Sequence, residues 1–285
     1  MAAEGLRDAR GPRNARRAHA HRARHAHRAA RRNRARADGR GAGGVTGRPA
    51  PRLLLGAFAL AALGDLVALL ADSDPGHAVC KPLLMPLLAA YVAVRRGPRL
   101  LIVALLFGWG GDTLLLFDAE PAFLAGMGSF AAGHVCYLVL FKRYGEGTRY
   151  RARGAALVAA YALALVVTVA LLWPDLPAGM RGPVAGYSVL LTAMAFRATA
   201  LGFTAAAGGA LFLLSDTLIA TGVAEWPQPP RPDFAIMLTY LAAQYLLAGA
   251  LLRASHQRIG TGTAVSSADR TTTTPSAATS PRAGA

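Results

Sequence analysis

Long runs of apolar residues alternate with short polar segments between residues 53 and 253. A helix needs about 17–25 mostly apolar residues to cross a bilayer. A membrane β-barrel would instead show strict alternation of polar and apolar residues, so the solid apolar runs favour helices. The expected fold is an all-α bundle of a polytopic membrane protein with eight transmembrane helices. The predicted spans are 53–71, 79–95, 99–117, 122–141, 154–173, 183–198, 204–224 and 234–252.

Basic residues are concentrated in the connections on one side of the predicted bundle. These connections are RRGPR (95–99), KRYGEGTRYRAR (142–153) and the turn near Arg197. The connections on the other side hold only Arg181 and Arg231. Since short cytoplasmic loops carry an excess of Lys and Arg, the sequence predicts that both termini are cytoplasmic. The expected location is the cell membrane.

The two ends of the chain differ from the apolar middle. Residues 1–52 contain fifteen arginines, which explains much of the formal net charge of +16. This segment is rich in Arg, Ala and His and has no apolar stretch from which to build a core, so we expect a disordered extension. It shows no aromatic interleaving or motif typical of nucleic-acid binding. The expected domains are the extension 1–52, the transmembrane domain 53–253 and a disordered Ser/Thr-rich tail, 254–285.

Ionisable and polar side chains interrupt the apolar runs. They are Asp65, Lys81, Asp112, His134, Tyr137, Asp216, Tyr240 and Gln244. An Asp or Lys at mid-membrane costs about 2.5–3.5 kcal/mol, so such residues should face the bundle interior and one another. His134 and Tyr137 are three residues apart and share a helix face. Tyr240 and Gln244 are four apart and also share a face. The pattern predicts that these polar side chains line one common cavity in the outer half of the bundle.

Several segments, in this order, resemble the YhhN-like membrane protein family. They are Lys-Pro at 81–82, Gly-Asp at 111–112, GSFAAGHVCYLVLF at 128–141, GGALFLLSDTLIA at 208–220 and YLAAQYLL at 240–247. The resemblance covers roughly residues 53–253. Characterised members of that family are lysoplasmalogenases, which hydrolyse the vinyl ether bond of a lysoplasmalogen to a fatty aldehyde and a glycerophospho-alcohol. The resemblance therefore implies a hydrolase acting on a lysophospholipid in the membrane, without a cofactor.

Vinyl ether hydrolysis suits the polar residues within the predicted helices. An acid protonates the β-carbon, water captures the resulting oxocarbenium ion, and the hemiacetal collapses. Two carboxyl groups can divide the roles of acid and electrostatic stabiliser, as in glycoside hydrolysis. Our hypothesis assigns Asp112 and Asp216 as this catalytic pair, with His134 and Tyr137 orienting water or the ether oxygen. The expected substrate-binding residues are Lys81, Tyr240, Gln244 and Asp65, with Lys81 a candidate for the lipid phosphate.

Three other interpretations remain open from the sequence. Intramembrane Asp and His residues also form proton relays in transporters, so a proton-coupled transporter is the main alternative. A metal-dependent lipid hydrolase could use Asp112, His134 and Asp216 as ligands, although we expect no metal. Cys80 and Cys136 suggest neither a disulfide framework nor a zinc site. A purely structural membrane protein is the third alternative.

Overall fold

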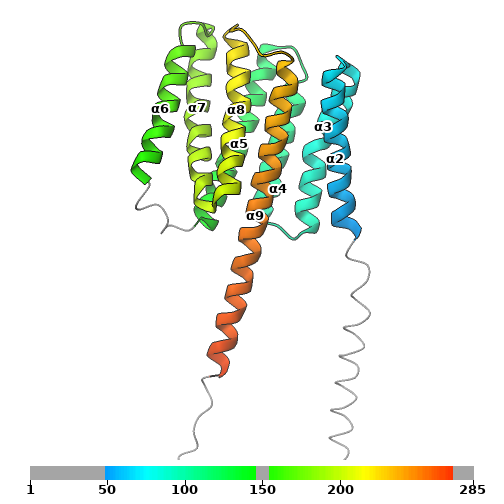
Figure 1. The fold of residues 1–285 in the computed structure, drawn as a ribbon, viewed down its shortest axis with the longest axis vertical. Helices are drawn as coiled ribbons and strands as arrows, with labels where there is room; N and C mark the ends of the chain where they lie inside the picture. The colour runs from blue at the N-terminus through cyan, green and yellow to red at the C-terminus, as the bar shows by residue number, and fades with distance from the viewer. Residues whose placement is uncertain (1–48, 146–153, 272–285) are drawn as a thin grey trace, which may run out of the picture. The chain divides into compact units, whose positions relative to one another are not determined.

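The computed structural model describes the backbone of residues 49–145 and 154–271 and the side chains of residues 50–145 and 154–258. The helices are α2 (Pro49–Leu70), α3 (Asp74–Val94), α4 (Arg99–Leu114), α5 (Glu120–Tyr144), α6 (Gly154–Leu172), α7 (Ala178–Ala198), α8 (Phe203–Val223) and α9 (Pro232–Thr271), with a 3₁₀ turn, η1 (Thr199–Leu201), before α8 (Figure 1). Over the described ranges there is no strand, which confirms the all-α prediction.

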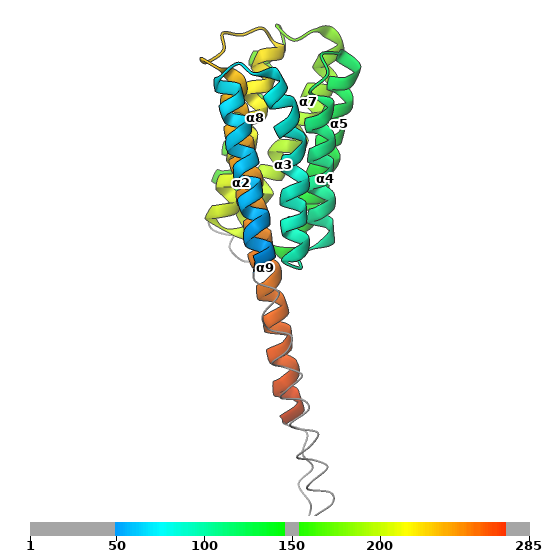
Figure 2. The same cartoon turned by 90° about the vertical axis from the view of Figure 1, so that its right-hand side faces the viewer.

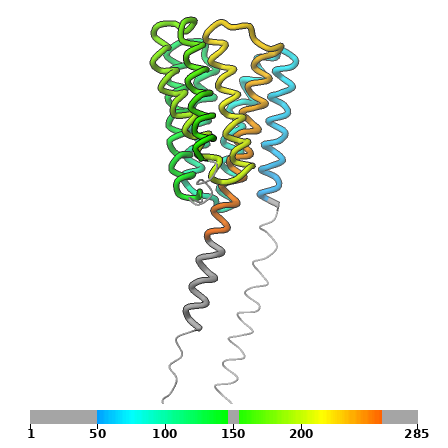
Figure 3. The backbone as a smooth tube through the Cα atoms, turned by 60° about the vertical axis from the view of Figure 1, so that its left-hand side comes forward, coloured from blue at the N-terminus to red at the C-terminus, as the bar shows by residue number. Residues whose placement is uncertain are grey.

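The helices run alternately up and down through one compact unit that begins at Pro51, so all but the first two residues of α2 belong to it (Figures 1 and 3). We call the end that carries the α2–α3, α4–α5, α6–α7 and α8–α9 connections the upper end. The lower end carries the α3–α4 and α7–α8 connections and is where α9 extends beyond the other helices (Figure 2). Arg95, Arg96 and Arg197 lie at the lower end, whereas Asp72, Asp118 and other acidic residues lie at the upper end.

Seven of the eight α-helices in the described residues are long and apolar enough to cross a membrane. The exception is α4, whose 16 residues fall short of the roughly 20 that a span requires. The predicted span 99–117 was therefore too long. The helix ends at Leu114 because the next amides bond three residues back: Leu116 N to Thr113 O at 3.3 Å and Phe117 N to Leu114 O at 3.2 Å.

The limits of the apolar region also differ from those expected. The first described helix begins at Pro49 rather than at residue 53. The last helix continues to Thr271, so the segment expected from 254 to be without regular structure is helical as far as that residue. Residues 1–48 and 272–285 lie outside the described part of the chain, so the disorder predicted for them remains a prediction.

Small residues let the central helices approach closely, as is typical of membrane bundles. At the α4–α5 contact, Ser129 Oγ donates to the Phe107 carbonyl over 2.6 Å. A Cβ added at Gly133 would lie 3.2 Å from the Ala104 carbonyl oxygen. By contrast, α6 buries only Leu172 and packs mainly on α7. The helix α6 therefore lies at the edge of the bundle.

Candidate functional site

Three buried or half-buried side chains from α5, α7 and α8 form a hydrogen-bonded chain, which we call the Asp216 chain. Tyr187 on α7 donates its hydroxyl hydrogen to Asp216 Oδ2 on α8. His134 Nε2 on α5 lies 2.9 Å from the same hydroxyl oxygen. Since the Tyr187 hydrogen is given to the carboxylate, the imidazole N–H donates to the tyrosine oxygen. Each residue of this chain thus sits on a different helix.

A second hydrogen-bonded chain, the Asp112 chain, joins α4, α5 and α9. Tyr240 donates to Asp112 Oδ2 over 2.9 Å. Gln244 Nε2 donates to the Tyr240 oxygen over 3.3 Å, and Tyr137 donates to Gln244 Oε1 over 2.6 Å. All four side chains are buried. Tyr240 and Gln244 share a face as expected. His134 and Tyr137, although three residues apart on one helix, serve different chains.

The two chains lie next to each other. The ring of Phe212 packs edge-on against both His134, with centroids 4.7 Å apart, and Tyr240, with centroids 5.4 Å apart. Asp112 is within electrostatic range of Asp216. The carboxyl groups do not bond to each other; each has its own tyrosine. The Phe212 ring therefore packs between the two chains, each of which contains one of the two aspartates.

An apolar pocket meets the Asp216 chain. Its walls come from α5, α6, α7, α8 and the turn after α4, and its polar wall groups include Asp216, Tyr187 and Thr217. The empty volume is about 830 Å³, which includes space on the open side. Phe130 lines this pocket and also packs its ring edge-on against Tyr240, with centroids 5.9 Å apart. Asp216 thus faces the pocket directly, whereas Asp112 lies behind Phe130.

Asp65 and Lys81 occupy a third position, near the upper end. Asp65 Oδ1 pairs with Nδ1 of His77 at 2.9 Å, and the carboxyl is completely buried. Lys81 is buried and within electrostatic range of Asp112, as is Asp65. The predicted span 79–95 placed Lys81 only two residues after the start of its helix, which is wrong. The helix begins at Asp74 rather than at residue 79, so Lys81 lies seven residues inside it, roughly 10 Å deep.

Sequence reasoning missed Tyr187 and His77. Tyr187 is a single tyrosine among small and apolar residues, with no polar neighbour at helical spacing on α7, so its local sequence gives no signal. His77 precedes the predicted span 79–95 and so lies outside the helices predicted from the sequence. Asp74 followed by Pro75 is a typical helix start, and recognising it would have placed His77 on the helix one turn before Lys81.

The metal alternative required Asp112, His134 and Asp216 to converge on one point. Among the residues with described side chains, no three His, Cys, Asp or Glu residues are placed to hold a common metal ion. His134 instead uses Nε2 on Tyr187 and packs its ring on Phe212. The geometry of these residues is that of two hydrogen-bonded chains.

Comparison with known proteins connects this chain to a family. The model of the YhhN family matches residues 76–251. The lysoplasmalogenase TMEM86B of Homo sapiens is 34% identical over 155 residues, which cover 54% of this chain and 64% of that protein. A lysoplasmalogenase of Mycobacterium bovis is 32% identical over 197 residues, covering 61% of this chain and 75% of that protein. The chain thus spans slightly less than two thirds of the human relative. No solved structure matches it.

Proposed function

Because this chain belongs to the YhhN family, we propose that it is an integral-membrane hydrolase that cleaves the vinyl ether bond of a lysoplasmalogen or a related single-chain ether lipid. The products are a fatty aldehyde and a glycerophospho-alcohol. The names of the human and mycobacterial relatives support this activity. The family resemblance inferred from the sequence motifs is confirmed.

The observation that carries the proposal is a carboxyl group in the wall of an apolar pocket. Asp216 lines the pocket together with Leu213, Ile219 and other apolar residues that suit a hydrocarbon chain. A vinyl ether needs an acid at its β-carbon, in surroundings that hold both the lipid chain and the reacting bond. We assign Asp216 as the proton donor because it is the carboxyl group that meets the pocket.

The Asp216 chain accommodates both charge states that acid catalysis requires. As a carboxylate, Asp216 accepts the Tyr187 hydrogen, and His134 donates to the tyrosine oxygen. As an acid, Asp216 donates to the Tyr187 oxygen, and Tyr187 donates to Nε2 of the other neutral tautomer of His134, in which the ring proton is on Nδ1. Passing between the two states therefore reverses two hydrogen bonds and moves the ring proton of His134 between Nε2 and Nδ1. Tyr187 and His134 act as positioning residues behind the acid.

Asp112 is assigned as the electrostatic partner. When Asp216 gives its proton to the β-carbon, positive charge develops on the ether oxygen and the neighbouring carbon. A second carboxylate nearby stabilises that charge. Lys81 lies within electrostatic range of Asp112, and a positive charge stabilises a neighbouring carboxylate. Tyr240 holds the Asp112 carboxyl in place, and Gln244 and Tyr137 support Tyr240 from the lower side.

We propose that the lower end of the bundle faces the cytoplasm and that the protein resides in the cell membrane. The lower end carries the described basic side chains of the α3–α4 connection and of the α5 and α7 ends, which is the positive-inside pattern. In this orientation the pocket and both aspartates lie toward the outer leaflet. Although short, α4 joins the lower end of α3 to the upper end of α5 (Figure 1), so with its following turn it completes an eighth crossing.

The test is aldehyde release from a lysoplasmalogen by the purified full-length chain in liposomes, with products identified by mass. We expect aldehyde and glycerophospho-alcohol in equal amounts from the wild type and a large loss for Asp216→Asn. Substrate-dependent proton flux without any product would instead support the transporter. Unchanged turnover in both Asp216→Asn and Asp112→Asn would reject the catalytic pair.

A further inference from the structure

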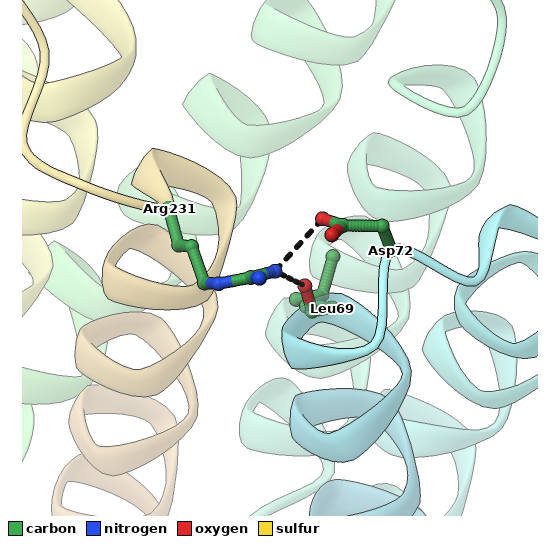
Figure 4. A network of polar contacts seen from close by, with 3 residues as sticks. All are labelled: Leu69, Asp72 and Arg231. Carbon is green, nitrogen blue, oxygen red and sulfur yellow. Dashed lines mark hydrogen bonds and ion pairs between the residues drawn. The ribbon is translucent and has the colours of Figure 1, made fainter.

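A second pocket opens at the upper end, between the α2–α3 connection and the start of α9. Its polar lining residues are Asp72, Ser73, Asp74, His77, Arg231 and Asp233. Arg231 Nη1 donates to Asp72 Oδ1 over 2.8 Å and to the Leu69 carbonyl over 3.2 Å (Figure 4). These hydrogen bonds join the α8–α9 connection to the end of α2 and to the α2–α3 connection. We call this hollow the polar pocket. Its charged rim suits water rather than a lipid chain.

His77 connects the polar pocket to the interior. Its ring lines the pocket and is 18% exposed, while Nδ1 contacts Asp65 Oδ1 at 2.9 Å. Asp65 is completely buried, and its second oxygen, Oδ2, has no protein partner. A buried carboxylate oxygen is a strong acceptor, and such groups in native proteins are normally satisfied by protein or by ordered water. Asp65 therefore presents an acceptor directly beneath the pocket.

Further polar groups continue toward the reaction centre. Lys81 is four residues after His77 on α3 and so lies on the same helix face, one turn deeper. Both Lys81 and Asp65 are within electrostatic range of Asp112. His77, Asp65 and Lys81 thus form a line of polar side chains from the polar pocket to the Asp112 chain. They come from α2 and α3, away from the pocket that meets Asp216.

The proposed reaction requires water to reach the reaction centre. Hydration of a vinyl ether consumes one water in each turnover: its oxygen bonds to the oxocarbenium carbon, and its proton restores the acid. The walls of the apolar pocket are mostly hydrocarbon and face a bound lipid chain. Water that crossed that pocket would have to displace the lipid. A separate aqueous route avoids this conflict.

We propose that the polar pocket is the water entrance of this protein and that Asp65 is a positioning residue that holds a water through Oδ2 on its way to Asp112. His77 orients the Asp65 carboxyl through Oδ1 and forms the gate between the pocket and the interior. The use of this water in hydrolysis rests on the proposed function, whereas the existence of the water path does not.

The path is tested without turnover by X-ray hydroxyl-radical labelling of the full-length protein in liposomes, read by mass spectrometry. Internal water yields radicals that oxidise the side chains beside it. Met85 and Tyr240 border the inner end of the path: a Cβ added at Gly108 would lie 3.8 Å from Met85 Cγ and 3.1 Å from the Tyr240 hydroxyl. Met194 on α7 is an internal reference, because it is equally buried and lies near the lower end.

We expect oxidation of Met85 and Tyr240 in the wild type at least about fivefold above that of Met194. Asp65→Leu removes the acceptor and His77→Phe closes the gate, so each should lower the labelling of Met85 to the level of Met194. The matched control is Asp118→Leu, which changes an exposed aspartate at the same end and should leave labelling unchanged. Retained thermal unfolding temperatures exclude loss of fold as the cause.

Measurements of kcat and KM then test whether the hydrolysis reaction uses this water. Asp65→Leu should lower kcat for aldehyde release by about tenfold with little change in KM, because lipid binding is untouched. If Met85 in the wild type is labelled no more strongly than Met194, the proposal that the polar pocket is a water entrance is wrong. Lost labelling with unchanged kcat would overturn its role in the reaction. Expected labelling in a wild type that releases no aldehyde would uphold the entrance and reject the hydrolase.

Discussion

Tyr187 on α7 donates a hydrogen bond to Asp216 on α8, at the place where both side chains meet the apolar pocket. This contact links a carboxyl group that faces the pocket to a histidine that is buried behind it. The roles proposed for the polar residues depend on this arrangement. Each of them predicts a separable effect of substitution.

Removing the proposed acid should abolish most of the activity. Asp216→Asn keeps the side-chain shape but cannot supply the proton, so we expect kcat to fall by about 10²–10⁴, the usual contribution of general acid catalysis. Asp112→Asn should cost less, because it removes stabilisation rather than the proton. The measurement is aldehyde release at saturating lysoplasmalogen. Asp118→Asn on the exposed α4–α5 connection is the control, and an equal loss in that variant would contradict the assignment.

The tyrosine between Asp216 and His134 should influence kcat rather than substrate binding. Tyr187→Phe keeps the ring against His134 but removes the hydroxyl that joins the chain. We expect kcat to fall by about tenfold with KM changed little, since only the response of the acid to proton loss is affected. Tyr245→Phe, at an exposed site on α9, should leave kcat and KM unchanged. A rise in KM alone would show that Tyr187 binds lipid instead.

Tyr137 should matter for stability more than for chemistry. It donates to Gln244, which is two hydrogen bonds away from Asp112. Tyr137→Phe leaves the buried Gln244 oxygen without its donor, which should lower the free energy of unfolding by about 0.6–1.7 kcal/mol, the range for hydrogen bonds between membrane helices. Denaturation in detergent measures the change. A loss of kcat at unchanged stability would restore the catalytic role first expected for this residue.

Close packing of α4 on α5 should not tolerate a methyl group beside Asp112. A Cβ at Gly111 would overlap with Phe130 Cε2. Gly111→Ala should therefore displace the Phe130 ring and cost about 1–3 kcal/mol of stability, as overpacking does. Gly128→Ala on α5 is the matched control, because a Cβ there meets nothing within 4 Å. Equal unfolding temperatures for the two variants would contradict the close contact.

Narrowing the apolar pocket should shift the preferred length of the lipid chain. Ala220 on α8 lines the pocket, and Ala220→Leu should raise KM for long-chain lysoplasmalogens by about tenfold while sparing short ones. The equivalent change at an exposed position of α6, Ala160→Leu, should leave the chain-length profile unchanged. Steady-state kinetics over a series of chain lengths makes the comparison.

The sequence predicted which polar residues lie inside the bundle better than it predicted the hydrogen bonds between them. The cost of placing Asp112 and Asp216 in hydrocarbon was sufficient reason to expect both inside the bundle, near other polar groups. Their partners depend on how distant helices align, and Asp112 and Tyr240 are 128 residues apart. Tyr187 carried no local signal on α7. The register between helices is fixed by tertiary packing, which a single sequence does not display.

Helix ends were the other source of error. The depth of Lys81 was underestimated because the apolar run begins later than the helix, which starts at Asp74 and Pro75. The span 99–117 was overestimated because apolar residues continue through the turn after Leu114. Hydropathy reports which residues tolerate lipid, whereas caps and backbone hydrogen bonds decide where a helix stops.

Because α6 forms a wall of the pocket yet buries only Leu172 of its own residues, we expect the proposed single-chain substrate to enter past α6 from within its leaflet, without first being extracted into water. Extraction would cost about 0.8 kcal/mol for every methylene exposed, and a lateral approach avoids nearly all of it. The effective concentration for this protein is then the two-dimensional abundance of the lipid in the bilayer. Diluting the lipid with inert phospholipid should slow turnover, whereas diluting the whole suspension with buffer should not.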